Sequence, residues 1–223
     1  SQDFNYAKQS SLFKNKDIRM ILGGIDLSVF YNKTREKELR QIYNIDENNF
    51  VILFGATNTI EKRKGVKYFI EAINKLESEI NISNISIVSI GRGELENLLP
   101  NTSAKINNLG YISDFNELSD IYNLVNIFVV SSIQDSGPMM INQSIASGTP
   151  VVCFDLGVAK DIVINGETGF KVPLFDTVAL SKKIKEMYLK TPEERYLLAD
   201  NCVELSKKNF SKEIAANKIL ELI

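Results

Sequence analysis

The sequence contains no histidine and no tryptophan, and its 223 residues include only two cysteines. Without histidine, the chain lacks the commonest general base and the commonest metal ligand of proteins. Cys153 and Cys202 both lie in apolar stretches, so we expect buried free thiols rather than a disulfide, and a reducing, cytoplasmic setting. Any chemistry must therefore use carboxylates, amides, Lys and Arg side chains and backbone groups.

Long apolar runs and a surplus of one charge are also missing. No apolar stretch approaches the ~18 residues of a membrane span, and the polar N-terminal residues contain no signal-peptide core. Lys and Arg total 26 against 28 Asp and Glu, so we expect no nucleic-acid partner. The remaining composition, 44% hydrophobic and 24% charged, is typical of a globular domain with a proper core.

Short apolar runs rich in Ile and Val alternate with amphipathic stretches. The expected strands span residues 50–54, 85–90, 105–109, 127–130 and 150–154, with weaker candidates at 19–22 and 170–172. The expected helices span residues 34–43, 65–78, 114–123, 138–147, 177–189, 192–208 and 211–223. This alternation predicts an α/β domain with a doubly wound parallel sheet, whose ligands bind at the carboxyl ends of the strands.

A basic cluster, Lys62-Arg63-Lys64-Gly65, stands just before one expected helix. Basic side chains beside a helix N-terminus can hold a phosphate, because the backbone N–H groups and the helix dipole favour the same charge. The alternative is a solvated charge run at a helix start, which is the commoner case for an isolated basic trio. Its place at the ligand edge of the sheet favours the phosphate role.

A second glycine-rich turn, Gly91-Arg92-Gly93, follows the strand at 85–90. It is not a dinucleotide fingerprint, because Glu96 replaces the third small residue and the motif does not follow the first strand. We therefore interpret it as a tight turn that gives a ligand close access to the backbone.

Residues 131–150 form the most informative segment, and we predict that it is a seat for an anionic ligand. Pro138 suits a first helical turn, and the helix-mouth amides would favour a diphosphate. The amides in question belong to Gly137, Met139 and Met140. Asp135 and Gln143, eight positions apart, could reach toward one ligand, although a helix-mouth cap and a surface or structural amide are their alternative roles.

The order of these motifs resembles one family. Residues 135–152 resemble the E-x7-E signature of group 1 (family 4) GT-B glycosyltransferases, where a small residue and Gly-Thr-Pro-Val-Val follow. Arg63-Lys64-Gly65 matches the family's basic K-G element, Gly91-Arg92-Gly93 its G-x-G loop and Gly110 the next glycine. Residues 166–170 match a late turn, and residues 23–26 with Phe30 are similar to its N-G-I-D linker.

The resemblance implies the C-terminal half of a GT-B fold, a Rossmann-like domain that binds a nucleotide diphospho-sugar, often a UDP-sugar. Residues 1–30 would be an interdomain connecting segment and residues 31–223 the nucleotide-sugar-binding domain, ending in C-terminal helices. The partner would be an N-terminal acceptor-binding domain, through which the enzyme associates peripherally with the inner membrane surface. The family is retaining, and the resemblance implies no cofactor and no metal.

Site roles follow from the same resemblance. Arg63 and Lys64 would hold the diphosphate and stabilise charge on the departing nucleotide, while Asp135 would contact hydroxyls of the transferred sugar. The implied donor-binding residues are Gly91, Gly93, Tyr111, Ile112, Ser136, Gly137, Pro138, Met139, Met140 and Gln143. Tyr111 and Ile112 would line the base pocket, and Gln143 would bind the ribose hydroxyls.

The sequence departs from the family pattern at both ends of the signature. Asp135 replaces the first Glu and keeps its charge, whereas Gln143 replaces the second Glu and loses it. Where the family often has an upstream arginine, this sequence has Thr57 and Asn58, and Arg63 is the candidate substitute. We expect weaker ribose binding, since charged hydrogen bonds exceed neutral ones by about a factor of two.

Three functions are consistent with these patterns. The leading hypothesis is the donor-binding domain of a retaining glycosyltransferase that makes a cell-surface polysaccharide or glycan, with a glycan or lipid-linked acceptor. The alternative is a non-catalytic nucleotide-sugar-binding module, suggested by Gln143. A GT-B sugar-nucleotide epimerase is disfavoured, because such enzymes typically rely on a histidine in this half.

Overall fold

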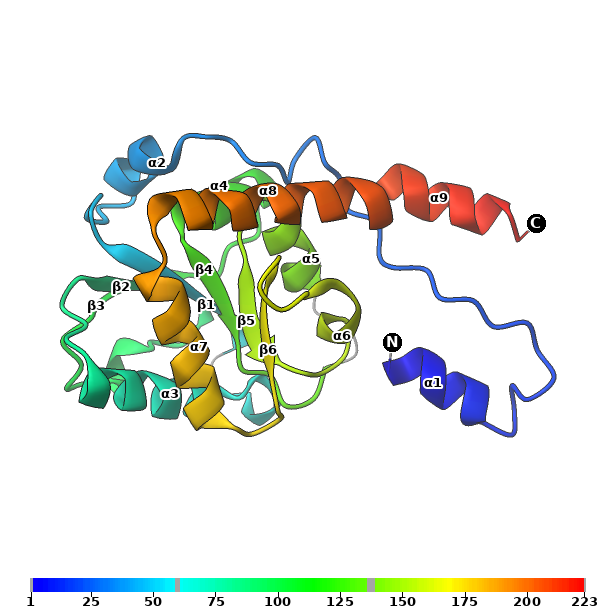
Figure 1. Cartoon of the computed structure of the whole chain (residues 1–223), viewed down its shortest axis with the longest axis horizontal. Helices are drawn as coiled ribbons and strands as arrows, with labels where there is room; N and C mark the ends of the chain where they lie inside the picture. Colours follow the sequence, from blue (N-terminus) through cyan, green and yellow to red (C-terminus); the bar gives the residue numbers. More distant parts are fainter. Residues whose placement is uncertain (1, 59–60, 136–138, 223) are drawn as a thin grey trace.

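The computed structural model describes residues 2–58, 61–135 and 139–222. Its centre is a parallel sheet of six strands in the order β3-β2-β1-β4-β5-β6 (Figure 1). The strands are β1 Phe50–Asn58, β2 Ile85–Arg92, β3 Lys105–Gly110, β4 Ile127–Val130, β5 Val151–Phe154 and β6 Gly169–Val172. The predicted doubly wound, Rossmann-like α/β fold is confirmed.

Helices cover both faces of this sheet. The helices are α1 Gln2–Gln9, α2 Glu36–Ile42, α3 Val66–Glu79, α4 Phe115–Leu124, α5 Met139–Ala146, α6 Ala159–Ile162, α7 Thr177–Leu189, α8 Pro192–Asn209 and α9 Lys212–Leu220. Two short 3-10 turns, η1 Lys62–Lys64 and η2 Glu96–Leu98, follow β1 and β2. Helices α3 and α7 contribute to the core on one face, and α2, α4, α5 and α6 to the core on the other, while α8 contributes to both.

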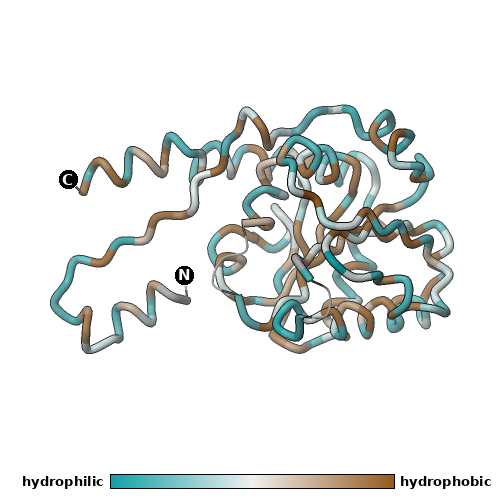
Figure 2. The backbone as a smooth tube through the Cα atoms, turned by 180° about the vertical axis from the view of Figure 1, so that it is seen from behind, coloured by the Kyte–Doolittle hydropathy of each residue, from teal (hydrophilic) through white to brown (hydrophobic). Residues whose placement is uncertain are grey.

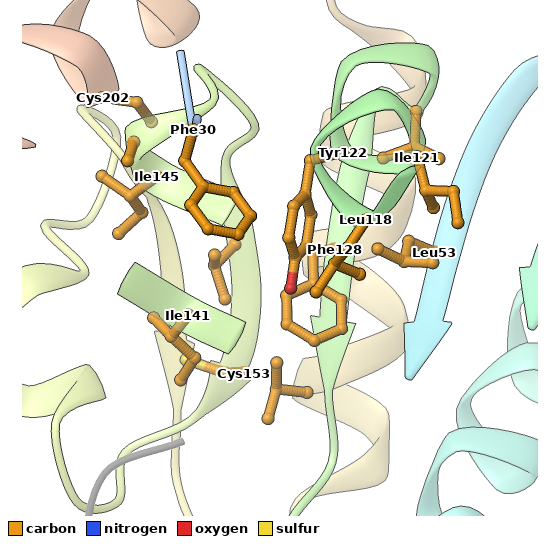
Figure 3. Packing of buried hydrophobic residues seen from close by; sticks show 14 of the residues in the cluster. Phe30, Leu53, Leu118, Ile121, Tyr122, Phe128, Ile141, Ile145, Cys153 and Cys202 are labelled. Carbon is orange, nitrogen blue, oxygen red and sulfur yellow. The ribbon is translucent and has the colours of Figure 1, made fainter. Parts of the chain in front are cut away.

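Strand β1 shows how the sequence builds these two cores. Val51 and Leu53 belong to the core beneath α4 and α5, whereas Phe50, Ile52 and Phe54 belong to the core beneath α3 and α7. Successive side chains of a strand point to opposite faces, so a continuous apolar run is buried on both sides. Figure 3 shows part of the first core.

Side-chain caps fix several helix starts near the positions that the sequence predicts. Asp114 accepts hydrogen bonds from the backbone N–H groups of Asn116 and Glu117 at the start of α4. Thr191 and Glu194 form a reciprocal capping box at the start of α8.

Three local predictions differ from the structure. Residues 19–22 form no strand, and Met20 is 40% exposed, because this short apolar run has no neighbouring strand to pair with. Helices α1 and α6 are not among the expected helices. Four-residue α6 is too short for periodicity to reveal, and α1 is a polar helix with no buried stripe that a pattern could show.

Helix α1 and the residues that follow it lie apart from the sheet (Figures 1 and 2), and the segment meets the core first at Leu22 and then at Ile25. There the Ile25 N–H donates to the Phe210 carbonyl at 2.8 Å, and the Lys212 N–H donates to the Ile25 carbonyl at 3.0 Å. These bonds join the connecting segment to the end of the chain. The predicted domain boundary after residue 30 stays a prediction.

Both cysteines are buried and unpaired, as the sequence predicts. Burial raises the pKa of the Cys153 and Cys202 thiols, so both stay protonated. Within the described part of the chain, no helix is both long and apolar enough to cross a membrane.

Candidate functional site

The strand order reverses between β1 and β4, which are neighbours in the sheet. The chain leaves β1 toward β2 on one side and leaves β4 toward β5 on the other, so the loops after these two strands diverge. A crevice at such a switch point is where open parallel sheets bind their ligands. The basic cluster follows β1 and Asp135 follows β4, so the topology brings both to this crevice.

Backbone contacts fasten the basic turn η1 to the loop after β4. The Ile133 N–H donates to the Arg63 carbonyl at 2.8 Å, and the Ser131 hydroxyl donates to the Gly65 carbonyl at 2.9 Å. Gly65 has a φ of 68°, and a Cβ on it would lie 1.9 Å from the Ser131 carbonyl oxygen. Only glycine fits this close approach, so the K-G pairing of the sequence has a structural cause.

Lys64, Arg63 and Asp135 form a charged cluster across the crevice. The Lys64 Nζ lies 2.6 Å from the Asp135 Oδ2, and an Arg63 guanidinium nitrogen lies 3.7 Å from the same oxygen. The Lys64 and Asp135 side chains are only 14% and 12% exposed, whereas Arg63 is 43% exposed and also pairs with Glu61. The cluster thus presents Arg63 to solvent and keeps an oriented Lys–Asp pair behind it.

Helix α5 begins beside this cluster. The described part of α5 starts at Met139, four residues after Asp135. The Met140 side chain fills the space over Gly55 of β1, where a Cβ would lie 2.5 Å from its methyl carbon. The predicted donor-binding residues Ser136, Gly137 and Pro138 lie outside the described residues.

Gln143 lies one turn further along α5 and faces the interior. It is 8% exposed, and its Oε1 accepts a hydrogen bond of 3.4 Å from the Tyr122 hydroxyl. Gln143 is therefore not a surface amide, whereas its alternative role as a structural amide fits its burial and its bond to Tyr122. Its contact with the ribose stays a prediction. Asp135 and Gln143 stand at the two ends of the stretch that resembles the E-x7-E signature.

The other predicted donor-binding residues lie at the ends of β2 and β3. Gly91 and Gly93 have φ angles of 122° and 103°. A Cβ on Gly91 would lie 1.6 Å from the Ala56 carbonyl, so packing against β1 by itself requires glycine there. The Arg92 guanidinium lies over the exposed Tyr111 ring, 5.6 Å from its centroid, and Ile112 follows.

The predicted site is long rather than compact. Neighbouring strands lie about 4.8 Å apart, so Tyr111 beyond β3 and Asp135 beyond β4 are separated by three strand spacings, roughly 14 Å. A ligand that touches both ends must therefore be extended. One of its ends would stack on the Tyr111 ring, and the other would carry charge toward the cluster of Arg63, Lys64 and Asp135.

Two residues that sequence reasoning missed shape this site, Ser131 and Tyr122. Ser131 holds the basic turn and Tyr122 holds Gln143. A signal existed for each: a serine directly after a buried strand, and a hydroxyl-bearing aromatic in the apolar stripe of α4. Neither signal identifies its partner, because that partner comes from a distant part of the chain.

A hollow of about 830 Å³ lies at the opposite edge of the sheet, near Phe50, Ser147 and Pro150. Its buried cation, Arg40, donates to the carbonyls of Leu124, Glu47 and Asn49. Arg40 also forms an ion pair with Glu36, so its donors are already occupied within the fold. The crevice at the carboxyl edge therefore remains the candidate site.

Comparison with known proteins agrees with the motifs. The sequence model of the family "Glycosyl transferases group 1" matches residues 49–190, and the chain belongs to this family. One curated relative is the capsular polysaccharide biosynthesis glycosyltransferase CapM of Staphylococcus aureus, 27% identical over 187 residues. That match covers 82% of this chain and 47% of CapM. The chain spans about half the length of the curated relatives it matches.

Solved structures show the same fold. Sucrose-phosphate synthase from Thermosynechococcus elongatus superposes with a TM-score of 0.84 at 23% identity, covering 100% of this chain and 56% of that one. HepE of Anabaena, solved with UDP and glucose, superposes with a TM-score of 0.72 at 16% identity, covering 92% and 56%. These likenesses confirm the predicted GT-B half as the fold.

Proposed function

We propose that this chain is the donor-binding domain of a retaining glycosyltransferase, which transfers a sugar from a nucleotide diphospho-sugar to a glycan or lipid-linked acceptor. The observation that carries the proposal is the Lys64–Asp135–Arg63 cluster at the strand-order reversal. Family membership supports the class of reaction.

In this proposal, Arg63 and Lys64 receive the diphosphate together with the first amides of α5. Arg63 is the more exposed cation and meets the ligand first, while Lys64 is held in one orientation by Asp135. Negative charge grows on the nucleoside diphosphate as its bond to the sugar breaks, and fixed positive groups aimed there lower the barrier. No metal or other cofactor is part of the proposal, because these groups supply the positive charge.

Asp135 has a second role at the sugar. A carboxylate can accept hydrogen bonds from two sugar hydroxyls, and its pairing with Lys64 holds it in one orientation at the crevice. Gln143, deeper along α5, would contact the ribose. Tyr111 and Ile112 would contact the base, beneath the Arg92 guanidinium.

An acceptor-binding domain is the proposed partner. The N-terminal segment and α9 carry apolar side chains that the described chain leaves exposed, including Tyr6 at 60%, Leu12 at 81% and Leu220 at 66%. Figure 2 shows brown, apolar positions alternating with teal ones along these segments, which extend beyond the sheet. A second domain seated against them would complete the cleft, act in the cytoplasm and carry any peripheral association with the inner membrane surface.

Titration of the chain with UDP-, GDP- and ADP-sugars by calorimetry tests donor binding. We expect one of the three nucleotides, UDP being the leading candidate, to bind in the micromolar to millimolar range. The isolated chain should show negligible transfer, and activity should need an acceptor-binding domain. Binding of none of the three donor classes would refute the proposal.

The alternative is a non-catalytic nucleotide-sugar-binding module, and one observation favours it. Gln143 replaces a carboxylate with a neutral amide at the ribose end of the site. Transfer to an acceptor by the complete protein, with the anomeric configuration of the product read by NMR, separates the two functions. Donor binding without transfer across a broad acceptor panel would support the module.

A further inference from the structure

We propose that the buried hydroxyl of Tyr122 fixes the orientation of the Gln143 side-chain amide. Gln143 then presents N–H donors to the ribose and favours ligands that carry a hydrogen-bond acceptor there. The inference rests on the proposed function, since it assumes that Gln143 meets the ribose. Tyr122 acts through Gln143 and is therefore a positioning residue.

Tyr122 is held rigidly. It is fully buried on α4, with its ring at edge-on angles to Phe30 and Phe128 at centroid distances of 6.3 and 6.0 Å. Figure 3 shows the ring standing among Phe30, Leu118 and Phe128, with the hydroxyl at the end away from the α4 backbone. The Thr149 hydroxyl donates to the Tyr122 carbonyl at 2.6 Å, so the backbone is fixed as well.

The hydroxyl of Tyr122 determines which way the Gln143 amide points. Burial raises the pKa of Tyr122, so the phenol keeps its proton and must donate it. Among the described residues, the Gln143 Oε1 at 3.4 Å is its hydrogen-bond partner. Turning the amide around would leave the phenolic proton without an acceptor in the core, at a cost of about 1–3 kcal/mol.

The consequence lies at the other end of the amide. With Oε1 turned to Tyr122, the NH2 group of Gln143 carries the two hydrogen-bond donors that remain for a ligand. A glutamate held by the same hydroxyl would instead offer a second carboxylate oxygen, which accepts hydrogen bonds from ligand hydroxyls. Having Gln in place of Glu at position 143 therefore changes a hydrogen-bond acceptor into a hydrogen-bond donor, rather than only weakening the contact with the ribose.

Ribose analogues of UDP test this polarity. Deoxy analogues at the 2′ or 3′ position lose the oxygen, whereas O-methyl analogues keep the acceptor oxygen and lose only the proton. At one of the two positions, we expect the methyl ether to bind the wild-type chain within about threefold of UDP and the deoxy analogue to bind about fivefold to tenfold more weakly. In Gln143→Glu, the methyl ether should fall to the level of the deoxy analogue.

Tyr122→Phe tests the positioning role. Without the phenolic hydroxyl the amide can turn either way, so the difference between ether and deoxy analogue should shrink to less than about twofold, while the dependence of UDP binding on Lys64 persists. Tyr188→Phe is the matched control, because Tyr188 packs edge-on against Phe50 with centroids 5.6 Å apart and does not contact Gln143. Circular dichroism should show that both variants fold.

Two outcomes overturn the inference alone: a methyl ether as weak as the deoxy analogue at both positions, or an unchanged analogue pattern in Tyr122→Phe. In both cases Lys64-dependent binding of UDP would leave the proposed function standing. Failure of UDP, GDP and ADP alike to bind, or binding unaffected by Lys64→Ala, would refute the proposed function and the inference together.

Discussion

Asp135 and Gln143 occupy the two ends of one short segment, and the fold holds them in different ways. Asp135 keeps its charge and pairs with Lys64, a residue from another loop, at 2.6 Å. Gln143 is neutral and is held by Tyr122, a residue of the core, at 3.4 Å. One end is thus assembled from two loops at the sheet edge, and the other is part of the packed interior.

The two kinds of support, an ion pair between loops at Asp135 and a buried hydrogen bond at Gln143, correspond to two requirements of an extended ligand site. In the proposed function, the charged end meets a diphosphate and a reacting sugar, and its cations and carboxylate are partly exposed. The neutral end needs only fixed geometry, which burial supplies at little cost in desolvated charge. Variants of the charged end should therefore change how binding depends on the diphosphate and the sugar, whereas variants of the neutral end should change how it depends on the ribose.

The largest effect should come from the glycine that joins the two loops of the charged end. Gly65→Ala places a Cβ 1.9 Å from the Ser131 carbonyl at a φ of 68°, so the loops must part, and we expect a loss of about 3 kcal/mol in the free energy of unfolding. Gly110→Ala is the matched control, since its φ is 72° but nothing lies within 4 Å. It should lose about 1 kcal/mol. Equal losses in urea unfolding would show that close approach at Gly65 contributes nothing.

Lys64→Ala should have the next largest effect, on binding of the nucleoside diphosphate. It removes the oriented cation and leaves the Asp135 carboxylate without its closest partner, so UDP should bind about 10- to 100-fold more weakly while uridine binding is unchanged. Lys62→Ala, an exposed lysine of the same turn, should change UDP affinity by less than about twofold. Calorimetry that finds equal losses for UDP and uridine would contradict the phosphate role.

The charged end is also the more predictable from sequence. Its residues follow strands that periodicity reveals, and parallel strands bring their carboxyl ends to one edge, so the sequence pattern alone predicts that Lys64 and Asp135 lie near each other. The Gly65 contact with Ser131 was not predictable, since a positive φ and a 1.9 Å approach leave no pattern beyond a single glycine.

The neutral end shows where sequence reasoning stops. Tyr122 stands in an apolar stripe, and a stripe residue predicts burial but not the direction of its hydroxyl. Its hydrogen bond to Gln143 depends on how α4 packs against α5, which is a tertiary property. The same limit explains why residues 19–22 were expected to form a strand: local composition cannot show whether a neighbouring strand is present.

Asp135→Asn should separate diphosphate binding by Lys64 from sugar binding by Asp135. The variant keeps hydrogen-bonding capacity but releases Lys64 from its ion pair and removes repulsion toward a diphosphate, so UDP alone should bind up to about fivefold more tightly. The additional affinity that a UDP-sugar has over UDP should disappear, because that gain comes from the sugar hydroxyls. Calorimetry with UDP and UDP-glucose measures both affinities. If UDP-glucose still binds more tightly than UDP in Asp135→Asn, Asp135 does not contact the sugar.

The smallest loss of UDP affinity should come from the neutral end. Gln143→Ala deletes one uncharged hydrogen bond, so UDP should bind about threefold to tenfold more weakly, whereas 2′- or 3′-deoxy-UDP should lose less at the position that Gln143 contacts. Gln41→Ala, an exposed glutamine of α2, is the matched control and should change neither ligand. The loss should also be independent of Lys64→Ala, because no hydrogen bond or ion pair among the described residues joins Lys64 to Gln143, and the effects of distant sites add. A strong coupling between the two variants would show that Lys64 and Gln143 act as one unit, although different parts of the fold hold them.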